Sequence, residues 1–442
     1  MEPLGVALAL SLWVLVGAGL YLLRRRSPFH LPTVALFATG LVGSFFPIAS
    51  SFIEPASWRN LDYLSPRIVA EAQAEYVAFA FGLVAAVAIA AQARWTGREH
   101  VSRPSSAARD PWMAAGLVLA GLAMYGVYAD RVGLGALLDR DDYALKYLVG
   151  QGLGPLQLGL PMAILGCLWA EASELPRATK NLYAALAAAI AIWSIAFISV
   201  RTNAVTIALG YASIFAWQRG AELRRVRPAV VVGLLALYAV LESFALFRGA
   251  YKGDVGDALA LIGSQGERAF ASAIGGSELS HPFVTTGEVL RLRDAGELGG
   301  RSLVDGVAAC LPRGIHPERP LTLSEQFVRA NYADLASRGG GAAFSFVAEG
   351  WLDFGSLFGP ALFGLVLGLF LAWVERSRDL RPAGLVARMA PYFVLLVAME
   401  HRNEFASMFK QVATLALVAV PLALLAEAIA STSLRNARAR TH

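Results

Sequence analysis

Residues 4–23 read LGVALALSLWVLVGAGLYLL, and Arg24, Arg25 and Arg26 follow at once. An apolar run of this length crosses about 30 Å of hydrocarbon as a helix. No basic region precedes the run and the arginines come after it, which reverses the charge order of a cleavable signal peptide. We therefore expect residues 4–23 to remain in the protein as its first membrane-spanning helix.

Comparable apolar runs recur from end to end of the chain. The sequence has 442 residues, is 56% hydrophobic and only 16% charged, and has a mean hydropathy of +0.53, beyond the averages of soluble domains. We expect an all-α, polytopic integral membrane protein with about eleven membrane-spanning helices. The expected spans are residues 4–23, 31–53, 68–93, 111–129, 153–172, 181–200, 202–218, 228–247, 355–374, 384–400 and 410–430.

The positive charges indicate how the spans are oriented. Lys and Arg in short loops collect on the cytoplasmic side of a membrane, and the basic loops follow every second expected span, beginning with the first. This places the N-terminus outside and the C-terminus inside. The alternation requires two spans around Ser199–Asn203, because a single helix there would reverse the topology of everything downstream.

One long polar segment interrupts the membrane pattern. It is rich in Arg and Gly and divides the chain into a membrane domain (1–247), a large, partly helical extramembrane loop (248–342) and a second membrane domain (343–442). The expected topology puts this loop outside. Because the other loops are too short to build a site, we expect the chemistry at this face.

Composition excludes several kinds of site. Two cysteines, Cys167 and Cys310, cannot build a metal centre or a disulfide framework, and the six histidines lack the paired spacing of a zinc site. We therefore expect no metal and no cofactor. The net charge of +5 does not indicate nucleic-acid binding, because most Lys and Arg residues flank spans, where they set topology.

Basic residues recur at the expected outer ends of spans. Arg201 lies between two adjoining spans, Arg248 follows the eighth span in FRG, and the turn HRNEF (401–405) follows the tenth. A guanidinium stays charged and offers a planar fork of donors that suits phosphate oxygens. Each arginine alone is as well explained by a side chain that reaches the lipid headgroups, but several on one face favour a site for an anionic headgroup.

The large loop adds a stiff basic segment and the start of a carboxylate-bearing helix. LPRGIHPERP (311–320) has three prolines, which favour an extended backbone, and RGGG (338–341) follows. FSFVAEGWLDFG (344–355) then enters the ninth span, and in a helix Glu349 and Asp353 share a face. Carboxylates under aromatic cover are candidates for a general acid or base, although a hydrated helix start explains them as well.

In this order, the motifs resemble those of the Wzy-type O-antigen and oligosaccharide repeat-unit polymerases. That family tends to show a Pro-Arg…Pro-Lys-Pro stretch and then Glu-x-x-x-Asn-Phe-Gly entering a helix. Here Arg319 stands for the Lys, Asp353 for the Asn, and His316 stands where an aromatic residue is common. SVRTN, FRG and HRNEF also resemble family positions, so the likeness covers residues 201–405.

The resemblance implies a glycosyltransferase with a GT-C-like fold of many helices. It would move a growing glycan from undecaprenyl pyrophosphate onto a lipid-linked repeat unit, as in lipopolysaccharide biosynthesis, without a metal. The site would face the periplasm from a bacterial inner membrane, with the N-terminus periplasmic and the C-terminus cytoplasmic. Its partners would be undecaprenyl-pyrophosphate-linked oligosaccharides as donor and acceptor, and membrane lipid; a chain-length regulator could join them.

The reaction assigns roles to the candidate residues. We expect the base to be Glu349, with His401 or Glu404 next, and we expect sugar contacts at His316 and Asp353. Arginines would stabilise the charge that develops on the leaving pyrophosphate. The expected pyrophosphate-binding residues are Arg201, Arg248, Arg313, Arg319, Arg338 and Arg402.

Two alternatives stay open. An O-antigen ligase, which transfers the finished glycan to a lipid A core, would share the donor and the arginines. A lipid-linked oligosaccharide flippase or another transporter would carry ionisable residues deep in the membrane and is often built from repeats. No internal repeat is visible, and Glu242 is nearly the only ionisable residue well inside a later span, which favours the enzyme.

Overall fold

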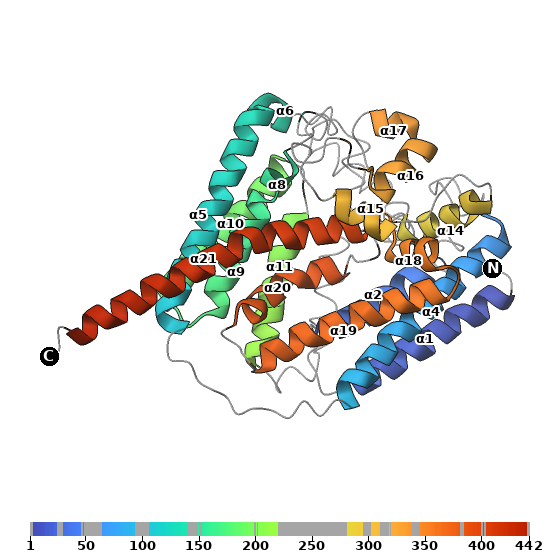
Figure 1. Ribbon diagram of the computed structural model, residues 1–442, viewed down its shortest axis with the longest axis horizontal. Coiled ribbons are helices and arrows are strands. Elements are labelled where there is room, and N and C mark those ends of the chain that lie inside the picture. The colour runs from blue at the N-terminus through green and yellow to red at the C-terminus, as the bar shows by residue number, and fades with distance from the viewer. Residues whose placement is uncertain are drawn as a thin grey trace, which may run out of the picture. The chain divides into compact units, whose positions relative to one another are not determined.

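The computed structural model is helical throughout the part of the chain that it describes (Figure 1), with no strand there. This confirms the all-α class expected from the apolar runs. The described residues are 3–23, 30–45, 47, 64–92, 106–138, 149, 153–198, 200, 202–219, 281–294, 302–309, 318, 320–337, 344–380, 384–398, 401 and 404–439.

Within these residues, six helices are long and apolar enough to cross a membrane. They are α1 (Pro3–Leu22), α4 (Pro66–Gln92), α5 (Ser106–Val132), α10 (Arg177–Ala196), α19 (Phe358–Leu380) and α21 (Phe405–Ala439). Two shorter apolar segments are α2 (Leu31–Gly40), continued by the π-helix η1 (Leu41–Phe45), and α20 (Leu385–Ala398). The protein is therefore an α-helical membrane protein, while the count of eleven spans and their orientation stay predictions.

The expected division near residue 200 is confirmed. α10 ends at Ala196 and α11 (Thr202–Arg219) begins at Thr202. Between them the backbone turns, with the Val200 N–H donating to the Ser194 carbonyl at 2.7 Å. The side-chain amide of Asn203 also donates to Ser194 Oγ at 3.0 Å, so this turn is held by side chain and backbone together.

Two other expected spans need correction. The run 153–172 is not one helix but α8 (Gly154–Gln157) and α9 (Gly159–Ala172), because Pro161 has no N–H to donate to the carbonyl four residues earlier. The run 355–374 begins as a helix only at Phe358, after a turn in which Gly355 and Leu357 have positive φ angles of 85° and 59°. The expected span 228–247 lies outside the described residues.

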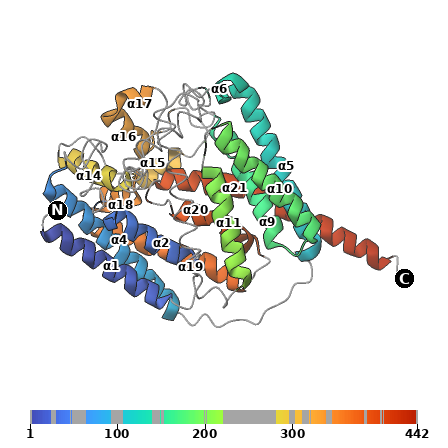
Figure 2. The same ribbon diagram turned by 180° about the vertical axis from the view of Figure 1, so that it is seen from behind.

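The chain forms two compact units, each discontinuous in sequence. The first comprises Met1–Ala93, Arg219–Ala372 and Val397–Met408, and α1, α2 and α4 lie side by side in it (Figures 1 and 2). α19 crosses α4 closely, because a Cβ on Gly82 or on Gly364 would collide with a backbone carbonyl of the other helix. The predicted three-part division at residues 247 and 342 stays a prediction.

The described part of the large loop is built into this first unit as short helices. α14 (His281–Asp294) packs against α4 and against α18 (Phe346–Phe354), and its residues 282–290 are all buried. α15 (Ser302–Ala309), α16 (Leu323–Asn331) and α17 (Ala333–Ser337) follow. Thr322 starts α16 with a capping box in which it and Glu325 each accept the other's backbone N–H.

The second unit comprises Arg94–Gln218, Trp373–Leu396 and Phe409–His442. Figure 2 shows α5, α9 and α10 packed side by side in it. Gly121 of α5 and Gly159 of α9 allow the closest approach, since a Cβ on either would lie 2.6 Å from the other's carbonyl oxygen. Trp169 of α9 is completely buried in the core of this unit.

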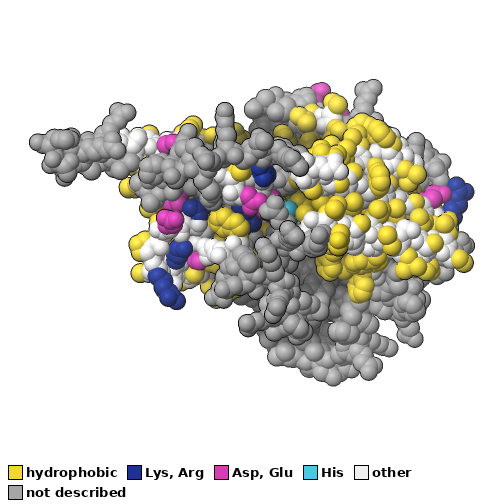
Figure 3. Space-filling view, turned by 90° about the horizontal axis from the view of Figure 1, so that it is seen from below, with side chains coloured by type: hydrophobic (Ala, Val, Ile, Leu, Met, Phe, Trp, Pro, Cys, Tyr) yellow, Lys and Arg dark blue, Asp and Glu magenta, His cyan; other side chains and the backbone are white. Residues whose placement is uncertain are grey.

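Large apolar side chains cover the outside of the membrane helices. Leu10 and Val14 of α1, Phe81 of α4 and Val366 of α19 are all more than half exposed, with Val14 the most at 71%. Figure 3 shows a broad hydrophobic face on the side of the first unit, with few charged side chains at its margins. Such a surface is suited to lipid and not to water.

Candidate functional site

The histidine that follows α20 in sequence lies in the interior of the first unit. His401 is 1% exposed, and its Nε2 lies 3.0 Å from Thr39 Oγ1. Its ring centroid is 5.2 Å from those of both Tyr76 and Phe79. Burial lowers the pKa of His401 to about 3, because the imidazolium would lose its hydration. The ring is therefore neutral near pH 7.

Thr39 determines which ring nitrogen of His401 carries the hydrogen. The Thr39 hydroxyl donates its single hydrogen to the Ala35 carbonyl at 2.8 Å, so Oγ1 can only accept from His401. Nε2 must then hold the hydrogen, and Nδ1 holds the lone pair. The sequence places Thr39 in an apolar run 362 residues away from His401.

Tyr76 of α4 connects the histidine to the start of α18. Its hydroxyl lies 3.3 Å from Ser345 Oγ. Ser345 is the N-cap of α18, where Oγ accepts the Val347 N–H at 3.1 Å. Glu349 follows one helical turn later, and its N–H donates to the Ser345 carbonyl at 2.9 Å. One serine thus joins the tyrosine to the helix that carries the glutamate.

Two buried glutamates hold the starts of two helices. Glu349 Oε2 accepts the N–H of Phe405, the first residue of α21, at 2.6 Å. Glu404 Oε2 accepts the Ser324 N–H in the first turn of α16 at 2.8 Å, and Oε1 accepts the Ser407 hydroxyl at 3.1 Å. Helix starts offer N–H groups without intrahelical partners and a partial positive charge, and both favour a carboxylate.

The pKa of the Glu404 carboxyl is subject to opposing effects. Burial raises the pKa of this carboxyl, and the hydrogen bonds from Ser324, Thr322 and Ser407 work in the opposite direction, leaving a net increase. A carboxyl with a raised pKa holds a proton at a higher pH than an exposed glutamate does. Glu404 is therefore suited to exchanging a proton with a bound hydroxyl.

These residues form one continuous set, which we call the turn cluster: Thr39, Tyr76, Ser345, Glu349, His401 and Glu404. It brings together the three residues that the sequence suggested as bases. Asp353 lies on α18 one turn beyond Glu349 and is half-buried. The other predicted site residues lie outside the described residues: Arg201, Arg248, Arg313, His316, Arg319, Arg338 and Arg402.

Sequence reasoning missed the contribution of α2 and α4. Besides Thr39 and Tyr76, α4 supplies Glu75, which is buried and accepts the Ser356 hydroxyl at 2.6 Å and the Leu357 N–H at 2.7 Å. It thereby holds the positive-φ turn between α18 and α19. The available signal was a glutamate inside an apolar run, since intramembrane ionisable residues are rare and commonly functional.

A further pair lies within the loop helices. The Tyr332 hydroxyl lies 3.0 Å and 3.1 Å from the two carboxylate oxygens of Glu288. Glu288 belongs to α14 and is buried, and this burial raises the pKa of its carboxyl. The pair ties α14 to the residue that follows α16, so the described loop helices are joined by polar as well as apolar contacts.

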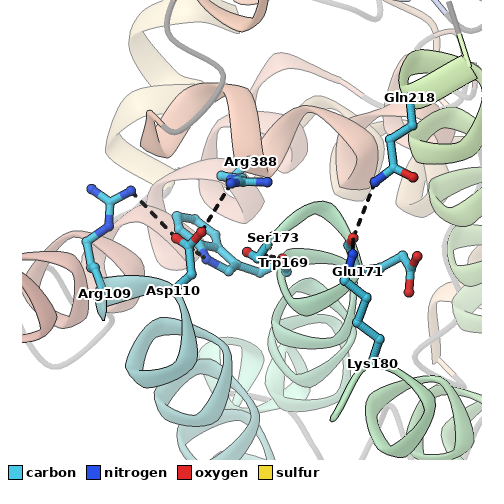
Figure 4. Close-up of polar contacts among 8 residues, drawn as sticks. All are labelled: Arg109, Asp110, Trp169, Glu171, Ser173, Lys180, Gln218 and Arg388. Atoms are coloured by element: carbon cyan, nitrogen blue, oxygen red, sulfur yellow. Dashed lines mark hydrogen bonds and ion pairs between the residues drawn. The ribbon is translucent and has the colours of Figure 1, made fainter. Parts of the chain in front are cut away.

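The second unit contains a polar group of a different kind, shown in Figure 4. Asp110 of α5 is 1% exposed. Its Oδ2 lies 3.1 Å from Arg388 Nη2, and its Oδ1 accepts the Trp169 indole N–H at 3.3 Å and lies 3.8 Å from Arg109 Nη2. We call Arg109, Asp110, Trp169 and Arg388 the ion-pair cluster.

Across the described ranges, no group of three or more His, Cys, Asp and Glu side chains could hold a metal ion. Comparison of the chain with protein-family models, with curated proteins and with solved structures gives no match.

Proposed function

We propose that the protein is a polysaccharide polymerase of the O-antigen type, working at the periplasmic face of a bacterial inner membrane on a GT-C-like fold. It moves a growing glycan from undecaprenyl pyrophosphate onto a lipid-linked repeat unit. The observation that carries the proposal is the 2.6 Å hydrogen bond between Glu349 and Phe405, which lie 56 residues apart. It joins FSFVAEGWLDFG to HRNEF, two of the motifs on which the family resemblance rests.

In the proposed reaction, the acceptor hydroxyl oxygen forms a bond to the anomeric carbon of the donor glycan. The bond between that carbon and the pyrophosphate oxygen breaks, and undecaprenyl pyrophosphate leaves with the electron pair. Arginines such as Arg313 and Arg402 stabilise its charge, and the hydroxyl proton passes to a carboxylate, for which Glu349 is the first choice and Glu404 the second.

His401 has a different role in this proposal. With a pKa of about 3, its ring is a poor proton acceptor near neutral pH, because an efficient general base has a pKa near the working pH. We assign it to positioning: its Nε2 hydrogen is directed to Thr39, and its ring packs between Tyr76 and Phe79. These contacts hold the His401 ring, and thus the residue directly before Arg402, in one orientation.

The transporter alternative receives less support from the buried charges. In the described ranges, most buried charged side chains of the apolar helices lie within about two turns of a helix end: Asp110, Glu375, Arg378 and Arg388. Glu75 lies deeper, nine residues into α4. A transporter places such groups near the middle of the membrane. A site at headgroup depth agrees better with a lipid pyrophosphate substrate.

Purified protein in lipid nanodiscs, incubated with a defined undecaprenyl-pyrophosphate repeat unit, tests the proposal. Nanodiscs support no ion gradient, so a transporter leaves the substrate chemically unchanged. A polymerase yields a ladder of longer lipid-linked glycans, resolved by product length. A ligase lengthens nothing and moves the glycan only when a lipid A core is added. Unchanged repeat units under both conditions would contradict the proposal.

A further inference from the structure

Gln73 is a buried amide in α4 whose hydrogen-bonding capacity is unused. Its side chain is 1% exposed, and neither Nε2 nor Oε1 has a hydrogen-bond partner in the part of the chain that the structure describes. Burying polar atoms without partners is destabilising, which explains why nearly all such atoms in folded proteins are paired. An apolar side chain at this position would be the more stable choice. The amide therefore points to a partner that the described part of the chain does not supply.

Gln73 lies beside the turn cluster. It precedes Tyr76 by three residues, which puts both on one face of α4, about 4.5 Å apart along the axis. The Tyr76 ring lies 5.7 Å from that of Phe283 in α14. η1 also approaches here, because a Cβ on Gly43 would lie 2.7 Å from Tyr76 Cβ. π-Helical segments such as η1 are frequent at functional sites.

The chemistry of the amide selects the class of ligand. It is uncharged and offers donors at Nε2 and an acceptor at Oε1, which matches a hydroxyl group that both donates and accepts. Phosphate oxygens at neutral pH mainly accept hydrogen bonds. They would therefore pair with the Nε2 donors but leave the Oε1 acceptor without a donor. The neighbouring rings of Tyr76 and Phe283 are buried as well, so the surroundings of the amide are aromatic and apolar.

We propose that Gln73 binds a hydroxyl group of a sugar ring, in a site formed by α4, η1 and Phe283 of α14. This rests on the proposed function and deepens it, since it places one sugar of the lipid-linked repeat unit beside the turn cluster. Gln73 contacts the substrate and lowers the stability of the protein, as residues kept for binding often do.

Thermal unfolding of the full-length protein in nanodiscs tests the site. The probes are methyl glycosides of a hexose, a deoxyhexose and an N-acetylhexosamine, with inorganic pyrophosphate as the contrasting probe. We expect at least one glycoside to raise the Tm of the wild type. Gln73→Met, with a side chain of similar length, loses this shift, keeps any shift caused by pyrophosphate, and unfolds without ligand at the same or a higher temperature than the wild type.

Gln411→Met is the matched control, because the Gln411 amide has a partner: its Nε2 donates to the Tyr392 hydroxyl at 3.1 Å. This variant should unfold at a lower temperature and keep the glycoside shift. Gln73→Leu serves as the second variant if Gln73→Met does not fold. Failure of both to fold contradicts the proposal, since removal of an unsatisfied amide does not prevent folding.

Three further results would overturn the assignment. The first is a glycoside shift that remains in Gln73→Met. The second is a wild type that no glycoside stabilises, as expected if a buried water satisfies the amide. The third is a ligand-free Gln73→Met that unfolds at a lower temperature than the wild type. Product length from the lipid-linked repeat unit tests the proposed function separately. A glycoside shift without polymer contradicts the polymerase and leaves the sugar site standing, whereas polymer without a glycoside shift contradicts the sugar site.

Discussion

The turn cluster of the first unit and the ion-pair cluster of the second bury carboxylates in different surroundings. Asp110 meets the guanidinium groups of Arg109 and Arg388 and the indole N–H of Trp169. Glu349 and Glu404 instead accept backbone N–H groups at the starts of α21 and α16. The first arrangement supplies full opposite charges, and the second supplies helix starts.

This difference indicates which cluster stabilises the fold and which one takes part in the reaction. A carboxylate between guanidinium groups is paired with full opposite charges, so its contribution is to stability. A carboxylate at a helix start feels only partial charges, and burial pulls its proton affinity upward, as it does at Glu404. We therefore expect the ion-pair cluster to hold the fold and the turn cluster to react.

Asp110→Asn should produce the largest loss of stability. The change leaves Arg388 buried without its anion, and breaking a buried ion pair costs about 3–5 kcal/mol. Arg67→Gln is the control, because Arg67 and Glu71 form an exposed pair at 2.7 Å, and such pairs contribute about 0–1 kcal/mol. Chemical unfolding in detergent measures both, and equal losses would contradict a structural role for the ion-pair cluster.

His401 should make the stability depend on pH. Its pKa of about 3 in the folded protein lies below the ordinary 6.5, so the unfolded chain binds the proton more tightly. Stability is complete above pH 6.5 and falls as the pH drops, by about 2 kcal/mol between pH 6.5 and 5 at 1.36 kcal/mol per unit. Glu404 acts in the opposite direction, because its pKa is raised.

The difference between wild type and His401→Phe isolates the histidine from Glu404. Both proteins are unfolded at a series of pH values, and the pH dependence between 6.5 and 5 is compared. We expect a shallower fall in the phenylalanine variant, whose ring keeps the packing against Tyr76 and Phe79. Parallel curves for the two proteins would show that His401 is not buried as described.

Ser345→Ala should have a smaller effect than the changes above. It removes the side chain that caps α18, and loss of an N-cap costs about 1 kcal/mol. Tyr76→Phe, which removes the 3.3 Å contact with Ser345, should cost less than that. Free energies of unfolding measure both, and a larger cost for Tyr76→Phe would show that the tyrosine hydroxyl, and not the cap, holds the start of α18.

Local sequence patterns predicted the helices well and the site in part. Apolar runs predicted α1 and α4 closely, and the charge alternation required the division that the structure has before Thr202. Glu349, His401 and Glu404 were predicted as candidates because they are ionisable residues that stand beside expected spans. The division of the run 153–172 into α8 and α9 and the turn before Phe358 were missed. A single proline or a positive φ angle changes only a few residues, whereas the apolar runs were read over about 20 residues.

The rest of the turn cluster depends on contacts over long separations. Thr39 meets His401 across 362 residues, and Tyr76 meets Ser345 across 269. Each of these side chains is ordinary in its own helix, where a Thr or Tyr in an apolar run is usually only packed. Their role follows from what lies opposite them, and one sequence without tertiary contacts does not contain that information.

The most direct test of the account is the initial rate at which folded protein lengthens the undecaprenyl-pyrophosphate repeat unit. Wild type, Glu349→Gln and Asp110→Asn are compared at a temperature where all three are folded. We expect the rate to fall by about 10²-fold or more in Glu349→Gln, the range for loss of a general base, and to stay near that of the wild type in Asp110→Asn. Equal rates for wild type and Glu349→Gln, or a wild type that lengthens nothing, would contradict it.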